Sequence, residues 1–341
     1  MAIPASNPDV AFVVCHHTGR LIDRCLASVV QTVGVTYETV VLTSDPTYTT
    51  DRAWQYYVEG GPAHKRNVGV TLTRAPILVF LDDDVEISPY CAYEFWKFLG
   101  ANPKCAMGFA KIYKMEEGRR DEFDDAGAWI TWTGFLWSRA GNYQRDTGQF
   151  EANQQCLAGK SATCVIRRRA FNSSGGFDKD YYILGEETDL AWRCWLRGWE
   201  CWYVPSAVSW HAFGCERLKP KKDYYVDERV FYRGASNYVS LLLTNCSTRT
   251  LWTTLPVHLL GWLWAAAGFA LTGQTSASRL VLAGLWDGLV RRLPSTLRKR
   301  QSVQSSRRVS ERVLRRTILY RPSWTYYLTR LSRYWTTQQH G

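Results

Sequence analysis

Three largely apolar runs in the first part of the chain limit what it can fold into. They occupy residues 10–15 (VAFVVC), 39–43 (TVVLT) and 77–81 (ILVFL). Short runs of this kind, without polar alternation, are typical of strands covered on both faces of a parallel sheet. Segments with helical spacing lie between them, at 21–32 and 62–75. The order strand, helix, strand, helix, strand predicts an α/β fold with a Rossmann-like sheet flanked by helices.

The chain is less uniform beyond residue 100. The stretch 105–160 is rich in glycine, tryptophan and acidic residues and predicts little regular structure. Residues 186–198 return to helical spacing, and 200–210 (ECWYVPSAVSW) have the pattern of a strand around a proline. The composition changes again near residue 245. We therefore expect two domains, 1–240 as the α/β domain and 241–341 as a helical, basic region.

The net charge of +11 belongs to the C-terminal end of the chain. Residues 279–341 hold 14 Lys and Arg against two acidic residues, a net charge of +12, whereas residues 1–278 carry −1. A body without excess positive charge offers no groove for a nucleic acid duplex, so we expect no nucleic acid partner. A cationic, aromatic-rich tail suits an anionic membrane surface.

One segment is long enough to cross a bilayer. Residues 251–273 contain no Asp, Glu, Lys or Arg in 23 positions. Pro256 and His258 interrupt this segment, so three arrangements stay open: a membrane span, an in-plane or re-entrant helix, and a buried core helix. The amphipathic segment 279–293 and the basic segment 298–308 that follow are typical of the cytoplasmic face of a membrane. We therefore expect attachment to the cytoplasmic side of a membrane through the C-terminal region.

The cysteines and the N-terminus bear on the cellular compartment. Ten cysteines lie between Cys15 and Cys246, without CxxC or zinc-type spacing, and many stand inside apolar runs. This pattern predicts free, buried, reduced thiols in a cytosolic protein. The first residues, MAIPASNPDVAFVVC, lack a basic segment ahead of the apolar run, so we expect no signal peptide.

Three consecutive aspartates, Asp82, Asp83 and Asp84, directly follow the third apolar run. In α/β sheets ligands bind beyond the C-terminal ends of the strands, which is where these carboxylates stand. Their mutual repulsion falls if a divalent cation lies between them, and oxygen ligands suit Mg²⁺ or Mn²⁺. Asp82 and Asp84 point to the same side of an extended chain. A solvated acidic turn is the alternative, and the position behind a buried strand favours the metal site.

A second acidic group stands in GEETDLAWRCWLRG, residues 185–198. Asp189 precedes Arg193 by four residues, which explains it as an ion pair on a helix, and Glu186 suits a helix N-terminus. Glu187 falls in line with the apolar helix face, where a carboxylate acquires a raised pKa and can accept a proton. Glu187 is therefore the candidate catalytic base, with Glu186 and Asp189 as alternatives.

His211 follows the last predicted strand, in SWHAFG. A single histidine is usually structural. Beside an oxygen-rich site it would supply a nitrogen ligand, which favours Mn²⁺ slightly over Mg²⁺.

The first 215 residues or so resemble a known family. They are similar to inverting, GT-A-fold glycosyltransferases of family 2, close to the bacterial rhamnosyltransferase-like branch. The resemblance rests on segments in the family's order: VAFVVCHHTGRLIDRCLASVVQ, TSD, AHKRNVGV before ILVFLDDDVEISP, DDAGAWI, RDTGQF, LAGKSATCVIRRRAF, GGFDKDYYILGEETDLAWR and VPSAVSWHAFG. Two segments depart from it. The first strand ends in Cys15-His16-His17, and the family's EDxD reads EETD, so its catalytic Asp corresponds to Glu187.

The resemblance implies a nucleotide-diphospho-sugar donor, a dTDP- or UDP-sugar, and a bound Mn²⁺ or Mg²⁺. Asp84, with Asp82 and His211, would hold the metal, and support of the nucleotide is the alternative role for Asp82. Asp45 would contact the nucleotide, and Asp83 would face the donor's ribose or sugar. Arg66 would hold ribose or phosphate, with an ion pair as the alternative. Glu187 would take the proton of the acceptor hydroxyl, and one displacement would invert the anomeric configuration.

The basic C-terminal region indicates the class of the acceptor. A membrane-attached enzyme facing the cytosol suggests a glycan acceptor linked to a polyprenyl diphosphate. Two other classes compete with this interpretation: a catalytically inactive, membrane-bound glycan- or nucleotide-sugar-binding protein, and a metal-dependent nuclease or phosphotransferase. The intact DDD, EETD and histidine argue against the first, and the neutral body argues against the second.

Overall fold

The computed structural model of this 341-residue chain describes residues 7–17, 21–117, 119–140, 144–212 and 228–321. The chain forms two compact units, each with its own apolar core. The first contains Met1–Ala128 and Ser138–Leu218, and the second contains Trp129–Trp137 and Lys219–Gly341. The domain boundary expected at residues 240/241 lies inside a helix of the second unit, and as a division of function it stays a prediction.

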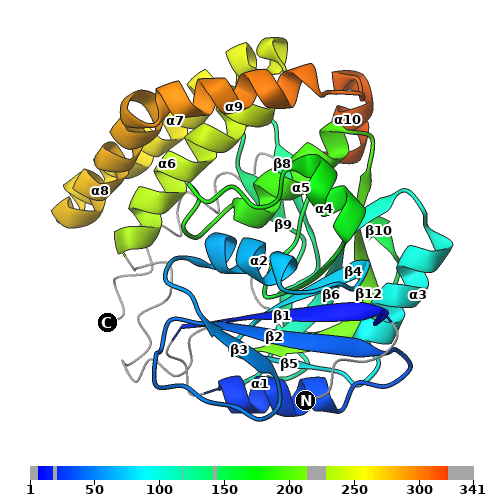
Figure 1. Cartoon of the computed structure of the whole chain (residues 1–341). Coiled ribbons are helices and arrows are strands. Elements are labelled where there is room, and N and C mark those ends of the chain that lie inside the picture. Colours follow the sequence, from blue (N-terminus) through cyan, green and yellow to red (C-terminus); the bar gives the residue numbers. More distant parts are fainter. Residues whose placement is uncertain (1–6, 18–20, 118, 141–143, 213–227, 322–341) are drawn as a thin grey trace. The chain divides into compact units, whose positions relative to one another are not determined.

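A mixed, ten-stranded sheet forms the centre of the first unit (Figure 1). Its strands lie in the order β10-β12-β6-β11-β4-β1-β2-β3, with β5 paired to β12 and β7 to β6. β1 is parallel to β2 and β4, and β12 is parallel to β6, whereas β11 is antiparallel to both of its neighbours. The expected α/β fold is therefore confirmed, and the sheet is mixed. The bounds are β1 Val10–His16, β2 Tyr37–Thr43, β3 Trp54–Tyr57, β4 Ile77–Asp82, β5 Val85–Ile87, β6 Cys105–Lys114, β7 Phe123–Asp125, β10 Gln154–Gln155, β11 Thr163–Arg167 and β12 Glu200–His211.

Helices cover both faces of this sheet. Apolar residues of α1 and α3 pack against one face of the sheet, in a core that includes Phe12 and Phe95. α2 lies on the opposite face, because side chains alternate along β1. It approaches the sheet so closely that a Cβ at Gly69 would lie 2.3 Å from Val13 Cγ1. The helices of this unit are α1 Ile22–Val30, α2 Pro62–Thr71, α3 Cys91–Ala101, α4 Arg168–Ser174 and α5 Glu186–Leu196.

The stretch 105–160 holds more regular structure than its sequence predicts. Residues 105–114 form β6, a ten-residue strand inside the sheet, so the expectation of irregular structure is wrong there. Lys111 breaks the apolar pattern of this strand, but its buried ammonium lies 3.1 Å from Asp146 and also pairs with Glu151. A buried charge with such partners is tolerated, and the partners lie far along the chain.

The strand expected at 200–210 is confirmed as β12. Its register against β6 shifts between Val204 and Val208, around Pro205. Proline cannot donate to a ladder, so a bulge is where a strand tolerates it. The end of β12 then pairs with β5, and His211 stands opposite Val85, next to the aspartates.

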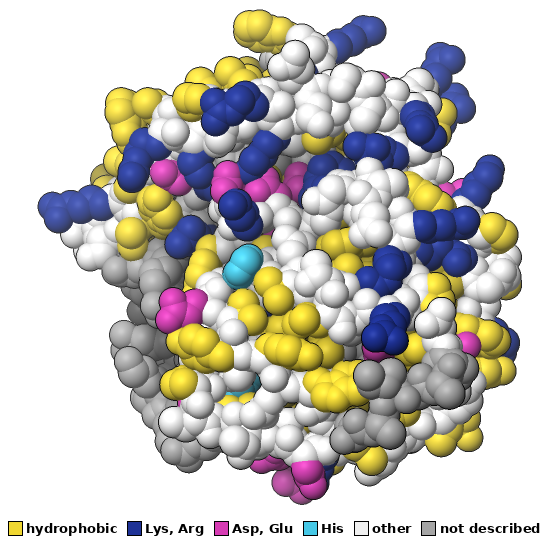
Figure 2. Space-filling view, in the orientation of Figure 1, with side chains coloured by type: hydrophobic (Ala, Val, Ile, Leu, Met, Phe, Trp, Pro, Cys, Tyr) yellow, Lys and Arg dark blue, Asp and Glu magenta, His cyan; other side chains and the backbone are white. Residues whose placement is uncertain are grey.

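The second unit is mainly helical. Its core includes Phe231, Val239, Phe269 and Val281. Figure 2 shows Lys and Arg side chains over these helices on the displayed face, beside hydrophobic side chains that face solvent. The elements are β8 Ala128–Thr131, β9 Leu136–Ser138, α6 Glu228–Asn245, α7 Thr248–Leu271, α8 Thr275–Trp286, the π-helix η2 Asp287–Arg291, α9 Leu293–Ser305, α10 Glu311–Thr317 and β13 Leu319–Tyr320.

Within the described residues, α7 is the single helix long and apolar enough to cross a membrane, by length and composition alone. One of its sides faces protein, because His258 is buried and its Nδ1 lies 3.1 Å from the carbonyl oxygen of Thr133. The nine cysteines within the described residues are all buried and free, as expected. Cys215 lies outside the described residues.

Candidate active site

The predicted site residues gather where β1, β2 and β4 end. In the parallel ladder Cys15 stands opposite Asp82 and His16 opposite Thr43, so the C-terminal ends of the three strands share one edge. His16 is buried and its Nδ1 lies 2.8 Å from Thr43 Oγ1. The sheet thereby brings acidic residues from separate parts of the chain to a single edge, where ligands bind in folds of this type.

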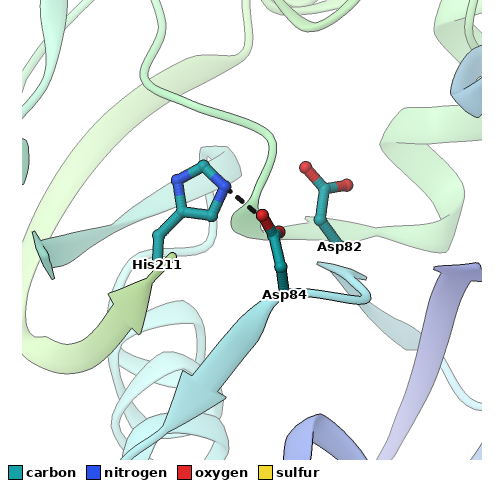
Figure 3. A group of neighbouring side chains, drawn as sticks. All are labelled: Asp82, Asp84 and His211. Carbon is teal, nitrogen blue, oxygen red and sulfur yellow. Dashed lines mark ion pairs between the residues drawn. The ribbon is translucent and has the colours of Figure 1, made fainter. Parts of the chain in front are cut away.

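Asp82, Asp84 and His211 form the candidate metal site (Figure 3). One ligand atom from each residue lies within 4.8 Å of the other two. Asp82 ends β4, Asp84 stands in the turn before β5, and His211 ends β12. His211 Nε2 and Asp84 Oδ1 are 3.2 Å apart and point toward one another. The two carboxylates are partly exposed, so an ion can reach them from solvent.

His211 is fixed from its other side by a buried carboxylate. Its Nδ1 lies 2.8 Å from Asp124 Oδ2, and the second oxygen of Asp124 lies 2.5 Å from Lys160 Nζ. Burial lowers the pKa of His211, but the charge of Asp84 and the hydrogen bond with Asp124 outweigh it and raise the pKa to about 10. Without a cation, the imidazole therefore carries a proton on each nitrogen. A divalent cation held by Nε2 would take the place of the proton on that nitrogen.

Two carboxylates and an imidazole with one nitrogen already anchored fit a divalent cation of the Mn²⁺ or Mg²⁺ type. The third aspartate has different surroundings. Asp83 Oδ2 accepts a hydrogen bond of 3.0 Å from the backbone N–H of His17. Burial and the adjacent Asp84 and Asp82 raise the pKa of Asp83 to about 6. Asp83 lies beside the metal site, toward the end of β1.

Arg66 connects the metal site to the second acidic group. Its guanidinium is 1% exposed and lies 2.7 Å from Asp82 and 3.0 Å from Glu186. The two terminal nitrogens of the Arg66 guanidinium therefore donate to different carboxylates, one to Glu186 and the other to Asp82. This geometry agrees with the ion pair considered from the sequence, and contact of Arg66 with a donor stays a prediction.

Glu187 occupies the first turn of α5. Glu187 is partly exposed, whereas Glu186 and Thr188 on either side of it are buried. Loss of water around the carboxylate and the neighbouring Glu186 carboxylate raise the pKa of Glu187 to about 8. The helix begins after Gly185, which has a φ of 92°, and after Leu184, whose φ of 72° is unusual for a residue with a side chain. This tight turn sets the direction in which the first turn of α5 faces.

Asp189 has the structural role that its spacing indicates. It is buried, and its Oδ2 lies 2.8 Å from Arg193 Nε. Asp45 follows β2 and is partly exposed. Hydrogen bonds from the side chain and backbone of Thr47 hold the pKa of Asp45 below its usual range, so it is ionised near the sheet edge.

Sequence reasoning assigned no role to Asp124 or Lys160, which the structure joins to His211. Both stand in segments that carried the family resemblance, DDAGAWI and LAGKSATC. A signal was present in the acidic pair behind an apolar residue, Phe123-Asp124-Asp125. Its partner His211 is 87 residues away, and spacing along the chain does not predict such a contact.

Comparisons with known proteins agree with the resemblance. The profile of "Glycosyl transferase family group 2" matches residues 77–286, which is more than half of the chain. The chain is also 35% identical over 81 residues to N-acetylglucosaminyl-diphospho-decaprenol L-rhamnosyltransferase of Mycobacterium tuberculosis, in strains CDC 1551 and H37Rv. The aligned part covers 24% of this chain and 25% of the relative.

Solved structures share the fold at low identity. TarS 1–349 of S. aureus in complex with UDP-GlcNAc has a TM-score of 0.53 and 14% identity, over 87% of this chain and 91% of that chain. The mannosyltransferase PcManGT of Pyrobaculum calidifontis in complex with GDP-Man and Mn²⁺ has a TM-score of 0.50 and 16% identity, over 84% and 89%. GalNAc-T7 with UDP, GalNAc and Mn²⁺ has a TM-score of 0.52 and 15% identity, over 80% of this chain and 59% of that chain. These likenesses confirm the GT-A fold class.

Proposed function

Because the chain belongs to glycosyl transferase family group 2, we propose that it is an inverting, metal-dependent enzyme that moves a sugar from a nucleotide-diphosphate donor to a lipid-linked glycan. The observation that carries this proposal is the bridge made by Arg66. One guanidinium separates Asp82 of the candidate metal site from Glu186, the neighbour of the candidate base Glu187. A site for the leaving diphosphate and a proton acceptor therefore lie close together, as a single displacement requires.

Asp82, Asp84 and His211 would hold the Mn²⁺ or Mg²⁺. When bound, the cation supplies positive charge that offsets the charge developing on the leaving diphosphate. Asp45, which follows β2, would accept a hydrogen bond from the nucleotide. Asp83, which follows β4 and faces the backbone N–H of His17 just after β1, would accept one from the ribose or sugar. These two assignments rest on the position of the side chains at the sheet edge.

Glu187 takes the proton of the acceptor hydroxyl as that oxygen attacks the anomeric carbon. The bond to the diphosphate oxygen breaks as the new glycosidic bond forms, so the configuration inverts without a covalent intermediate. A pKa of about 8 suits this role, because a base is most effective when its pKa lies near the working pH.

The donor and acceptor are proposed from chemistry and from the relatives. A dTDP-sugar, with rhamnose first, or a UDP-sugar is the donor class. The Mycobacterium relative is named for transfer of L-rhamnose to N-acetylglucosaminyl-diphospho-decaprenol. A polyprenyl-diphosphate acceptor would place the enzyme at the cytoplasmic face of a membrane.

The surface of α7 supports membrane attachment through the second unit. Its exposed apolar side chains recur every three or four residues and so form one stripe, whereas the opposite side of the helix is buried. The stripe consists of Trp252, Pro256, Leu260, Leu263, Ala267, Ala270 and Leu271, and the polar residues Thr248, Arg249 and Thr253 are exposed at the N-terminal end of α7. A helix with one buried side suits a position in the membrane plane better than a free span.

Exposed arginines in the same unit match an anionic lipid surface. They include Arg279, Arg291, Arg298, Arg312, Arg315 and Arg316. Co-sedimentation of the full chain with phosphatidylglycerol vesicles tests this attachment, with phosphatidylcholine vesicles as control. The variant L260E/L263E should stay in the supernatant. If it pellets with the vesicles like the wild type, the stripe is not the attachment surface.

The donor site is tested by titration calorimetry. UDP and dTDP are titrated into the full chain with Mn²⁺ and again after chelation with EDTA. We expect that at least one nucleotide binds in the presence of Mn²⁺ and loses most of its affinity without it, and that Asp84→Asn reproduces the loss. A nucleotide affinity that is unaffected by chelation would overturn the metal assignment.

A further inference from the structure

Four polar side chains are joined by successive ion pairs that end at the candidate metal site. Lys160 Nζ lies 2.5 Å from Asp124 Oδ1, Asp124 Oδ2 lies 2.8 Å from His211 Nδ1, and His211 Nε2 lies 3.2 Å from Asp84 Oδ1. The side chain of Asp124 is 0% exposed. Such a carboxylate stays ionised only if its oxygens are paired, and here Lys160 Nζ faces one oxygen and an imidazole nitrogen of His211 faces the other.

An ionised carboxylate accepts hydrogen bonds and donates none. The imidazole nitrogen that faces Asp124 must therefore carry the proton. When the ring is neutral, its lone pair is then on Nε2, the nitrogen that faces Asp84. A metal ligand needs this lone pair, so the partner on one side of the ring decides whether the other side can bind a cation.

We propose that Asp124, itself held by Lys160, is a positioning residue that fixes the ring and the tautomer of His211 so that Nε2 binds the divalent cation. This inference rests on the proposed metal site and adds a residue with no predicted role. Partners of this kind behind a metal-bound histidine contribute about 10- to 100-fold to metal affinity.

The substitution Asp124→Asn makes a sharp test because Lys160 has no lone pair. Its ammonium only donates, so the amide oxygen of the new side chain must face Lys160 and the NH₂ group must face His211. The NH₂ group then donates to Nδ1 and moves the ring proton to Nε2. The shape of the side chain is kept, whereas the tautomer is reversed.

The chain also offers a matched control in the next residue. Asp125 is buried like Asp124, but its Oδ2 accepts from the backbone N–H groups of Gly127 and Lys160 at 3.3 and 3.1 Å. Within the described residues, Asp125 forms no hydrogen bond or ion pair with His211. Asp125→Asn therefore removes a neighbouring buried charge of the same type and leaves the tautomer unchanged.

The experiment measures Mn²⁺ binding to the full chain at one fixed pH by electron paramagnetic resonance, with no sugar donor present. Electron spin-echo modulation from ¹⁴N reports whether an imidazole nitrogen binds the ion. We expect nitrogen modulation in the wild type and in Asp125→Asn. In Asp124→Asn the dissociation constant should rise about 10- to 100-fold and the nitrogen modulation should disappear.

The outcomes separate the two levels of the argument. If the wild type binds no Mn²⁺, the metal site of the proposed function and this inference fail together. If the wild type binds Mn²⁺ and Asp124→Asn keeps both the affinity and the nitrogen signal, this inference alone fails. A second measurement, made on the wild type, tests the proposal even if Asp124→Asn does not fold. In ¹⁵N-histidine spectra with Mg²⁺ bound, His211 should carry its proton on Nδ1, and a bare Nδ1 would overturn the proposal.

Discussion

Replacement of Arg66 by methionine should destabilise the first unit more than any single change at an exposed ion pair. Methionine keeps much of the volume of the side chain but leaves Asp82 and Glu186 facing an apolar group. Breaking a buried ion pair by removal of one partner costs about 3–5 kcal/mol. The two carboxylates differ in how well water can replace the lost contact.

The exposures set the expected magnitude. The side chain of Glu186 is 5% exposed, so it cannot rehydrate, whereas that of Asp82 is 31% exposed and regains water. The loss should therefore lie near the lower end of the range, about 3 kcal/mol. For a unit of this size, about 1 kcal/mol shifts the melting temperature by about 2–4 °C. The first unit should therefore melt about 6–12 °C lower.

Differential scanning calorimetry of the full chain measures this shift. Arg24→Met is the matched control, because Arg24 is 52% exposed and its partner Glu86 keeps Arg120 at 2.8 Å. The control should change the free energy of unfolding by less than about 1 kcal/mol. An unchanged melting temperature in Arg66→Met, together with a raised KM for the donor, would refute this reasoning and assign Arg66 to donor binding.

Three further predictions concern the base, its pH dependence and helix packing. Glu187→Gln should bind the donor normally and lose about 10²- to 10⁴-fold in kcat, and a wild-type rate would transfer the role to Glu186 or Asp189. Since the pKa of Glu187 is about 8, kcat/KM should rise with pH up to that value. Glu186→Gln removes a charge that raises this pKa in addition to burial, so the acidic limb should move to lower pH, and a fixed limb would contradict this contribution of Glu186. Gly69→Ala should lower the stability of the first unit by about 1–3 kcal/mol through the 2.3 Å contact with Val13, which thermal melting checks.

The sequence predicts the edge of the sheet well for a physical reason. Apolar runs of strand length mark β1, β2 and β4, and parallel strands necessarily end at one edge. Polar residues at the ends of such runs must then share that edge, as His16 does with Thr43 of the neighbouring strand. The sequence predicts the ends of helices and strands less accurately than it predicts the helices and strands themselves. The helix expected at 62–75 ends at Thr71.

Contacts between distant segments could not be predicted in this way. Lys111 reads as a polar interruption of a strand, and only partners 35 and 40 residues away make its burial acceptable. Arg66 is a comparable case, because Glu186 is 120 residues from it. A cationic side chain in the sequence indicates a surface or a ligand contact. Its place inside the fold depends on acids that come close only after the sheet has formed.

The basic tail shows a similar limit. Its charge predicts an anionic partner, yet part of that charge supports the second unit itself. Arg300 donates to the carbonyl oxygens of Leu243 and Cys246 at the C-terminal end of α6, at 2.6 and 2.7 Å. Cations at this end of a helix are favourable. Only the exposed arginines are therefore available to bind an anionic membrane surface.

The central claim is sugar transfer with inversion at a metal-dependent site. It is tested most directly by incubation of the full chain with a panel of dTDP- and UDP-sugars, Mn²⁺, and lipid extract from the organism that encodes it. Glycolipid products are detected by mass spectrometry, and the anomeric configuration is determined by NMR. We predict one preferred donor, an inverted linkage, and no product with EDTA or with Glu187→Gln. Nucleotide-sugar binding without transfer from any donor in the panel would contradict the account and favour an inactive binding protein.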